Sequence, residues 1–202
     1  MMKEAGFSLH RAAWLASAAV CMLVGCASAP VGSGKVERTA PLQLALAPVS
    51  LGCSLAVQQQ LTVLPPSGSA QTLDALLEVD GQSVRLALFH LDQRMGALSW
   101  DGQQLQTQLS RWWPAQLSPA QVLSDMQLAL WPAPAIAQAL PAGWQVQDGA
   151  QVRRLTHQGQ LRVEVQAVGR DAFDIRYAPV AWSLQVASPG GMQPCMAAQE
   201  AL

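Results

Sequence analysis

Apolar and polar residues alternate with a period of two along most of the chain. Val57, Leu61 and Val63 fall on one side of the first such stretch, and Gln58 and Gln60 fall on the other. This alternation is typical of strands that bury one face and expose the other, as in antiparallel sheets. Similar stretches cover residues 72–79, 83–88, 104–109, 160–167, 173–177 and 180–186. The pattern predicts a mainly β protein.

Turn signals separate these stretches. Asp80-Gly81 and Asp101-Gly102 are strong hairpin signals, because glycine adopts positive φ without strain. Asp148-Gly149 and Gln158-Gly159 carry the same signal with less force. We interpret the aspartates as turn residues rather than catalytic acids.

The segment 118–140 interrupts the alternation. Ser118, Pro119 and Gln121 predict a helix that starts with a capping box. Apolar residues then recur on one helical stripe, and Trp131-Pro132 ends the helix. A second short helix is predicted over residues 134–140. The predicted order is therefore about five strands, two short helices and four or five strands.

A single long sheet with one apolar face must curl, and the two helices are available to cover that face. The sequence thus predicts an α+β, mainly β fold: a curved antiparallel sheet that forms an unclosed β-barrel with the helices as a lid. Alanines interrupt the apolar rows, so both an open cavity and a packed interior remain compatible with the sequence. The predicted lining comprises Leu77, Val79, Leu86, Leu88, Leu123, Met126, Leu130, Val163, Val165, Ile175, Trp182 and Leu184.

Composition excludes two broad classes of protein. The chain has 202 residues, a formal charge of −1, 50% apolar residues and 12% charged residues. A nucleic-acid-binding protein needs a cationic surface that this balance does not supply. An acidic disordered chain would contain far less apolar material. We therefore expect a folded domain with no nucleic-acid partner. We also expect the protein to be a monomer.

The first residues predict secretion. A basic head precedes an apolar run of about 11 residues, shorter than the roughly 20 that span a bilayer. The following Leu23-Val24-Gly25-Cys26 resembles the lipobox of bacterial lipoproteins. That resemblance implies a cleaved signal peptide over residues 1–25, acylation of Cys26, a tether over residues 26–41 and one domain over residues 42–202. Ala27, where aspartate would resemble an inner-membrane retention signal, implies the periplasmic face of the outer membrane.

Two cysteines remain for the folded part. Cys53 and Cys195 lie in an oxidising compartment, and a disulfide between them would close a long loop. Two unpaired thiols are the alternative. Neither cysteine has a second ligand at metal-binding spacing, so we expect no metal site.

Catalytic signals are weak. His90 and His157 stand in no recognisable catalytic motif, and no phosphate-binding glycine loop is present. The acidic residues appear singly in turns or on polar strand faces. We expect no enzyme activity and no cofactor.

The order of elements resembles the outer-membrane lipoprotein receptor of the bacterial lipoprotein-localisation pathway. The most specific stretch is residues 84–102, where an apolar strand enters a short loop and a second strand follows. In that family a leucine protruding from the loop helps push acyl chains into the membrane. The resemblance implies this role for Leu91, flanked by Phe89 and His90, although the loop has His-Leu-Asp in place of Pro-Leu-Gly.

Other phrases resemble an uncharacterised family of outer-membrane lipoproteins from aryl-polyene (flexirubin-type) gene clusters. The most distinctive is Asp125-Met126-Gln127-Leu128-Ala129-Leu130-Trp131-Pro132, and Leu140-Pro141-Ala142-Gly143-Trp144 is another. The resemblances imply a protein that binds a lipid or acylated cargo in a hydrophobic cavity and passes it on. A periplasmic carrier protein would deliver that cargo.

A non-catalytic structural or adaptor lipoprotein is the alternative hypothesis. A partner would then bind the sheet edge or the loop Trp112-Trp113-Pro114. These tryptophans also fit a membrane-interface anchor or a plug at one end of the barrel.

Overall fold

A computed structural model describes residues 42–178 and 180–191, and in this part of the chain ten β-strands form one antiparallel sheet. A short 3-10 helix, η1, covers Pro48–Leu51. The first five strands are β1 (Leu55–Leu64), β2 (Gln71–Val79), β3 (Val84–His90), β4 (Gln93–Trp100) and β5 (Leu105–Leu109). The helices α1 (Pro119–Leu130) and α2 (Ala133–Ala139) follow. The remaining strands are β6 (Trp144–Asp148), β7 (Val152–His157), β8 (Gln160–Ala167), β9 (Ala172–Tyr177) and β10 (Trp182–Ala187). The predicted order of strands, two helices and strands is confirmed.

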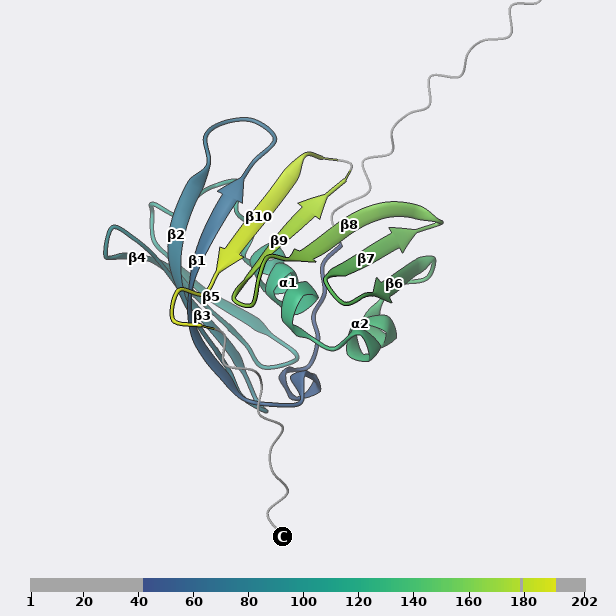
Figure 1. The fold of residues 1–202 in the computed structure, drawn as a ribbon. Helices are drawn as coiled ribbons and strands as arrows, with labels where there is room; N and C mark the ends of the chain where they lie inside the picture. Colours follow the sequence, from purple (N-terminus) through teal and green to yellow (C-terminus); the bar gives the residue numbers. More distant parts are fainter. Residues whose placement is uncertain (1–41, 179, 192–202) are drawn as a thin grey trace, which may run out of the picture. The chain divides into compact units, whose positions relative to one another are not determined.

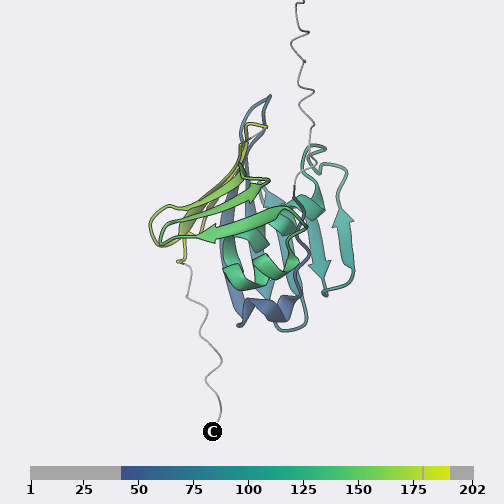
Figure 2. The same ribbon diagram turned by 90° about the vertical axis from the view of Figure 1, so that its right-hand side faces the viewer.

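The sheet is a pair of meanders joined in the middle. Its spatial order is β5-β4-β3-β2-β1-β10-β9-β8-β7-β6, and β1 pairs with β10 where the meanders meet. Among the described strands, β5 and β6 do not pair with each other, so the barrel is unclosed. The sheet curves around α1 in both views (Figures 1 and 2). The predicted fold class is confirmed.

Alternation decides which face of the sheet is buried. In β2, Leu73, Ala75, Leu77 and Val79 are buried, while the intervening residues are exposed. Leu77 lies opposite Leu86 of β3, so buried residues of neighbouring strands stack on one face. This face is concave and carries the core.

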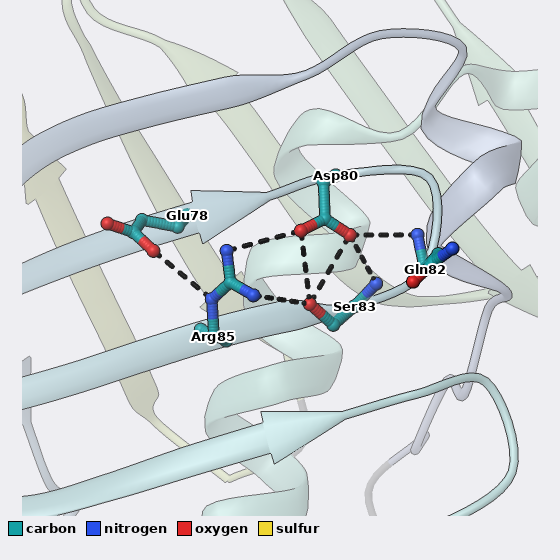
Figure 3. Close-up of polar contacts among 5 residues, drawn as sticks. All are labelled: Glu78, Asp80, Gln82, Ser83 and Arg85. Atoms are coloured by element: carbon teal, nitrogen blue, oxygen red, sulfur yellow. Dashed lines mark hydrogen bonds and ion pairs between the residues drawn. The ribbon is translucent and has the colours of Figure 1, made fainter.

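The predicted turn at Asp80 forms the hairpin between β2 and β3 (Figure 3). Asp80 Oδ1 accepts hydrogen bonds from the backbone nitrogens of Gln82, at 2.8 Å, and Ser83, at 2.7 Å. These bonds hold the pKa of Asp80 below its ordinary value. Arg85 forms ion pairs with Glu78 and Asp80 on the solvent side. Asp101 caps its own turn similarly, through the backbone nitrogens of residues 103 and 104.

The start of α1 corrects one prediction. Pro119 does occupy the first turn, but the Ser118 side chain makes no capping hydrogen bond. The capping-box prediction is wrong because Gln121 is directed into the protein, where buried polar groups compete for its amide. The predicted end of the helix is confirmed, since Leu130 is the last helical residue and Pro132 cannot continue the helix.

Residues 42–47 form an extended segment that we call the strap. Leu42, Leu44 and Leu46 are buried and alternate with exposed residues. The strap pairs with no described strand. Its backbone instead bonds to side chains of α1, as described below.

Candidate functional site

The concave face is closely filled where α1 crosses the first meander. Four of the predicted lining residues, Leu77, Leu86, Leu123 and Met126, surround the same small cavity. The other residues around it are Val84, Leu98, Trp100 and Leu105. The cavity volume is about 10 Å³, which is close to the minimum for one water molecule. Here the interior is packed, as a core would be.

The remaining predicted lining residues also face inward. Leu88 and Val79 are buried in the first meander, and Leu130 of α1 is half-buried. In the second meander Val163, Val165, Ile175 and Leu184 are buried, and Trp182 is half-buried against them. The predicted apolar set is therefore one contiguous core.

Polar side chains of α1, those of Ser124 and Gln127, hold the strap. Leu44 N donates to Ser124 Oγ at 2.9 Å, and Leu46 N donates to Gln127 Oε1 at 2.9 Å. Gln127 Nε2 returns a hydrogen bond to Leu46 O at 3.1 Å. These side chains satisfy buried backbone groups that a neighbouring strand would otherwise pair with.

A buried carboxyl group lies on the same helix. Asp125 Oδ1 accepts hydrogen bonds from Tyr177 Oη at 2.5 Å and Gln121 Nε2 at 2.8 Å. Burial raises the pKa of Asp125 to about 7, although both hydrogen bonds oppose that rise. Burial, with the nearby Asp125 carboxyl, raises the pKa of Tyr177 above its ordinary value. The expectation that acidic residues lie only in turns or on polar faces is therefore wrong for Asp125.

The C-terminal end of α1 is fixed from two sides. Trp131 Nε1 donates to Oγ of Ser50, a residue of η1, at 3.0 Å. Arg153 of β7 donates from Nη1 to Leu128 O at 2.6 Å and to Trp131 O at 2.8 Å. The guanidinium thus satisfies carbonyl groups that the helix end leaves without partners. These contacts hold α1 in place over the concave face.

The hairpin between β3 and β4 leaves a leucine uncovered. His90 pairs with Gln93, so Leu91 and Asp92 alone form the turn. Both have positive φ, 48° for Leu91 and 61° for Asp92, as a type I′ turn requires. The Leu91 side chain is 80% exposed. Its predicted neighbours differ, because Phe89 is half-buried and His90 is exposed.

An open groove of about 690 Å³ begins beside this leucine. We call it the hairpin groove. Its lining is Ala70, Gln71, Thr72, Leu73, His90, Leu91, Gln93, Met95, Trp112, Pro114 and Gln116. In its wall, His90 Nδ1 lies 3.1 Å from Thr72 O of the neighbouring strand β2. The lining carries no Asp, Glu, Lys or Arg side chain, so it offers apolar contact and neutral polar groups.

The two neighbouring tryptophans have different environments. Trp113 packs over Gly96, so closely that a β-carbon there would lie 2.8 Å from the indole ring. Its Nε1 donates to Leu117 O at 2.6 Å. Trp112 is 61% exposed, and the Arg111 guanidinium lies 4.5 Å from its ring centre. Trp113 therefore fits the predicted plug, whereas Trp112 faces the hairpin groove.

Cys53 is disulfide-bonded. Its predicted partner, Cys195, lies outside the described residues, so that pairing stays a prediction. The predicted signal peptide, the acylation site Cys26 and the tether also lie outside them. Within the described part, no helix is long and apolar enough to cross a bilayer, and no group of three metal-binding side chains occurs.

A protein-family model matches the part of the chain that contains nearly all of the sheet and both α-helices. The matching stretch, residues 56–188, runs from within β1 to just past β10. The chain belongs to the DUF3261 family. The family is described as "Protein of unknown function (DUF3261)". No curated protein matches the chain. The match includes α1 and the hairpin groove and omits the strap.

The sequence pattern predicted some residues of this site and missed others. Leu91 and the apolar lining were predicted. The strap was missed, although Leu42, Leu44 and Leu46 alternate like a strand. The buried partners Asp125 and Tyr177 were missed because a helix and a strand far apart in sequence bring them together.

Proposed function

We propose that this protein is an outer-membrane lipoprotein that binds a lipid or acylated cargo and passes it to the membrane. The observation that carries the proposal is Leu91, which is 80% exposed at the hairpin tip and borders an uncharged groove. The lipobox-like Leu23-Val24-Gly25-Cys26 supports anchorage through acylated Cys26.

Leu91 stabilises neither the turn nor the core. Left-handed backbone costs a non-glycine residue roughly 1–2 kcal/mol, and glycine or asparagine would suit this turn better. An exposed leucine also gains nothing from burial. Strain of this kind, at an exposed site, points to a function outside the fold itself. Contact with acyl chains would bury the Leu91 side chain, and the free energy of that burial would offset the cost of the strained turn.

Trp112 extends the apolar surface beside Leu91. Both residues line the hairpin groove, and Arg111 stacks on the exposed indole. Tryptophan and arginine are favoured at the boundary between headgroups and acyl chains. In this proposal, the hairpin tip and Trp112 face the bilayer together.

The groove favours an apolar chain over a charged headgroup. It lies within the usual size range of small-molecule sites, about 300–1,000 Å³. Its polar groups are amides, a hydroxyl and His90, and its walls include Met95 and Pro114. A flexible methionine adapts to a cargo that must also leave. As the resemblance to aryl-polyene lipoproteins implies, the cargo would be a polyene-bearing lipid or an acylated protein.

In this proposal, cargo meets the hairpin groove before the concave interior. The space beneath Leu123 and Met126 is only about 10 Å³. A chain entering there must displace α1 or the strap, which are held by Gln127, Arg153 and Asp125. The proposed lid would thus open against several hydrogen bonds.

An adaptor lipoprotein remains the second candidate function, and the close packing beneath Leu123 and Met126 favours it. A solid core under α1 needs no cargo, and a partner protein would then occupy the exposed end of the sheet. We propose no enzymatic activity in either case.

Native mass spectrometry, with lipid extraction from the same sample, tests the proposal. A Cys26→Ala chain, exported by a conventional secretory signal and purified from periplasm without detergent, is the sample. A near-stoichiometric acyl or polyene species is expected. A chain that remains free of lipid after incubation with excess envelope lipids would favour the adaptor function.

The hairpin is tested by binding the same chain to vesicles of envelope phospholipids. Leu91→Glu is expected to reduce binding at least tenfold while the circular dichroism spectrum and melting temperature stay unchanged. Leu76→Glu is the matched control, because Leu76 is 48% exposed on β2 but lies outside the groove. Equal binding by both variants would exclude Leu91 as the membrane contact.

A further inference from the structure

The outer side of β5 is a free edge. β5 is the last strand at one end of the sheet, and no described strand pairs with that side (Figure 2). Its sequence is Leu-Gln-Thr-Gln-Leu, without charge or proline. Edge strands usually carry such residues because they discourage pairing with another chain. The β5 edge lacks this protection.

The opposite edge of the sheet is different. Helix α2 packs beside β6. Asp148, the last residue of β6, forms an ion pair with Arg153 at 3.0 Å. An edge strand that has a helix packed beside it and carries a charged residue is a poorer template for strand addition. The two edges are therefore not interchangeable, and pairing is expected at β5.

The β5 sequence reads identically in both directions around Thr107. If two copies pair antiparallel on a two-fold axis at Thr107, Leu105 of each lies opposite Leu109 of the other. Gln106 of each then lies opposite Gln108 of the other. Two-fold interfaces use the same surface on both copies, so a palindromic edge suits one.

The backbone of β5 is in the correct phase for this pairing. Ser110 N donates to Met95 O at 2.8 Å, in the register that places Gly96 opposite Leu109. Hydrogen-bonded residues alternate along an antiparallel strand, so Gln108 and Gln106 also bond to β4. The amide and carbonyl groups of Leu105, Thr107 and Leu109 therefore face outward. In the symmetric pair these groups bond reciprocally to their counterparts in the second copy.

The side chains that would face each other across the two-fold axis are also complementary. Leu109 is 43% exposed, and a facing Leu105 would cover it. On the other face, the Gln106 and Gln108 amides can donate to and accept from each other. No like charges meet, and directly opposed side chains stabilise a sheet. Each of these features favours a second copy over an unrelated strand.

We propose that the protein forms a two-fold symmetric dimer in which β5 of two copies pair around Thr107, continuing the sheet from one subunit into the other. This inference does not rest on the proposed cargo function. It differs from the monomer expected from the sequence.

Cysteine cross-linking in cells that make the full-length protein tests the register. Opposed residues in a hydrogen-bonded pair have Cα atoms about 5.5 Å apart, within the range of a disulfide. Thr107→Cys is expected to give a disulfide-linked homodimer under mild oxidation. Gln106→Cys is the matched control. In the proposed register Gln106 lies opposite Gln108 of the second copy, so the two substituted cysteines would be offset by two residues along the strand. We expect at least tenfold less dimer from this variant, and the unsubstituted chain corrects for native cysteines.

Equal, low cross-linking by the two folded variants would overturn the proposal. So would a Thr107→Cys product that contains another protein in place of a second copy.

Sedimentation gives an independent measurement on the full-length protein with Cys26→Ala. This chain is expected to sediment as a dimer and its Thr107→Pro variant as a monomer. Proline removes the outward Thr107 amide but leaves the bonds to β4 intact. Thr107→Val keeps the backbone and should remain dimeric. A monomer at high micromolar concentration without any of the β5 substitutions would overturn the dimer.

Discussion

Apolar side chains are buried on the concave face but exposed at the β3–β4 hairpin. Under α1, apolar side chains are covered, and buried polar groups such as Gln127 have hydrogen-bond partners. At the hairpin, Leu91 and Trp112 are exposed. The same strands β3 and β4 contribute to both regions, so the contrast is not one of fold.

This difference between buried and exposed apolar residues suggests that different residues determine stability and binding. Residues that hold α1 over the sheet are expected to stabilise the fold strongly, and residues at the hairpin are expected to affect it little. Membrane or cargo binding should follow the reverse order. Four predictions test this comparison.

The largest difference in stability is expected between two tryptophans. Trp131→Ala should lower the free energy of unfolding by about 3–5 kcal/mol, because the indole is fully buried. Trp112→Ala should change it by less than about 0.5 kcal/mol. Urea denaturation of both variants measures the two changes. Similar losses would mean that the hairpin end also belongs to the core.

A smaller loss is expected at the strap. Gln127→Ala leaves Leu46 N without its hydrogen-bond partner, whereas Leu46 O keeps the bond from Trp100 Nε1. An unsatisfied buried polar group costs about 1–3 kcal/mol. Gln58→Ala, at an exposed β1 position, is the control and should be nearly neutral. An unchanged Gln127→Ala variant would show that the strap is not held by α1.

Asp125 should make stability depend on pH. Its pKa is about 7 in the folded protein and near 3.9 in the unfolded chain. Between these values the folded state binds more protons, so the free energy of unfolding falls as pH rises from about 4 to about 7. The slope is at most about 1.4 kcal/mol per pH unit.

Denaturation at a series of pH values measures this slope. Asp125→Asn should abolish most of it, since the amide does not titrate. Asp92→Asn, on the exposed hairpin, should retain it. A wild-type protein whose stability rises throughout this range would contradict the assignment to Asp125.

The smallest effect is expected at the hairpin tip, with the opposite sign. Leu91→Gly relieves left-handed strain of roughly 1–2 kcal/mol. The greater unfolded-chain entropy of glycine costs about 0.4–1 kcal/mol, so the free energy of unfolding should rise slightly. Vesicle binding should nevertheless fall. Glycine therefore separates the proposed membrane contact from stability, and a destabilised variant would mean that Leu91 supports the fold.

Much of the fold could be predicted from local patterns. Alternation located most strands, Asp80-Gly81 marked a hairpin, and Pro132 marked the end of α1. These signals depend on neighbouring residues alone. The apolar lining could be predicted for the same reason, since one strand face must be buried.

The polar contacts could not be predicted in this way. Ser124 and Gln127 look like ordinary helix residues until the strap, about 80 residues earlier in the chain, lies against them. The capping-box prediction failed at Gln121 because tertiary partners outcompeted the local one. Periodicity describes which face is buried and does not describe which buried groups meet.

If the protein is anchored through Cys26 as proposed, the strap has a mechanical consequence. It begins at Leu42, directly after the segment that would lead to an acylated Cys26. Tension on such an anchor would reach the domain through Leu42, whose carbonyl accepts from Ser124 Oγ at 3.2 Å. The strap would then pass a pull from the membrane to α1, the element that covers the concave face.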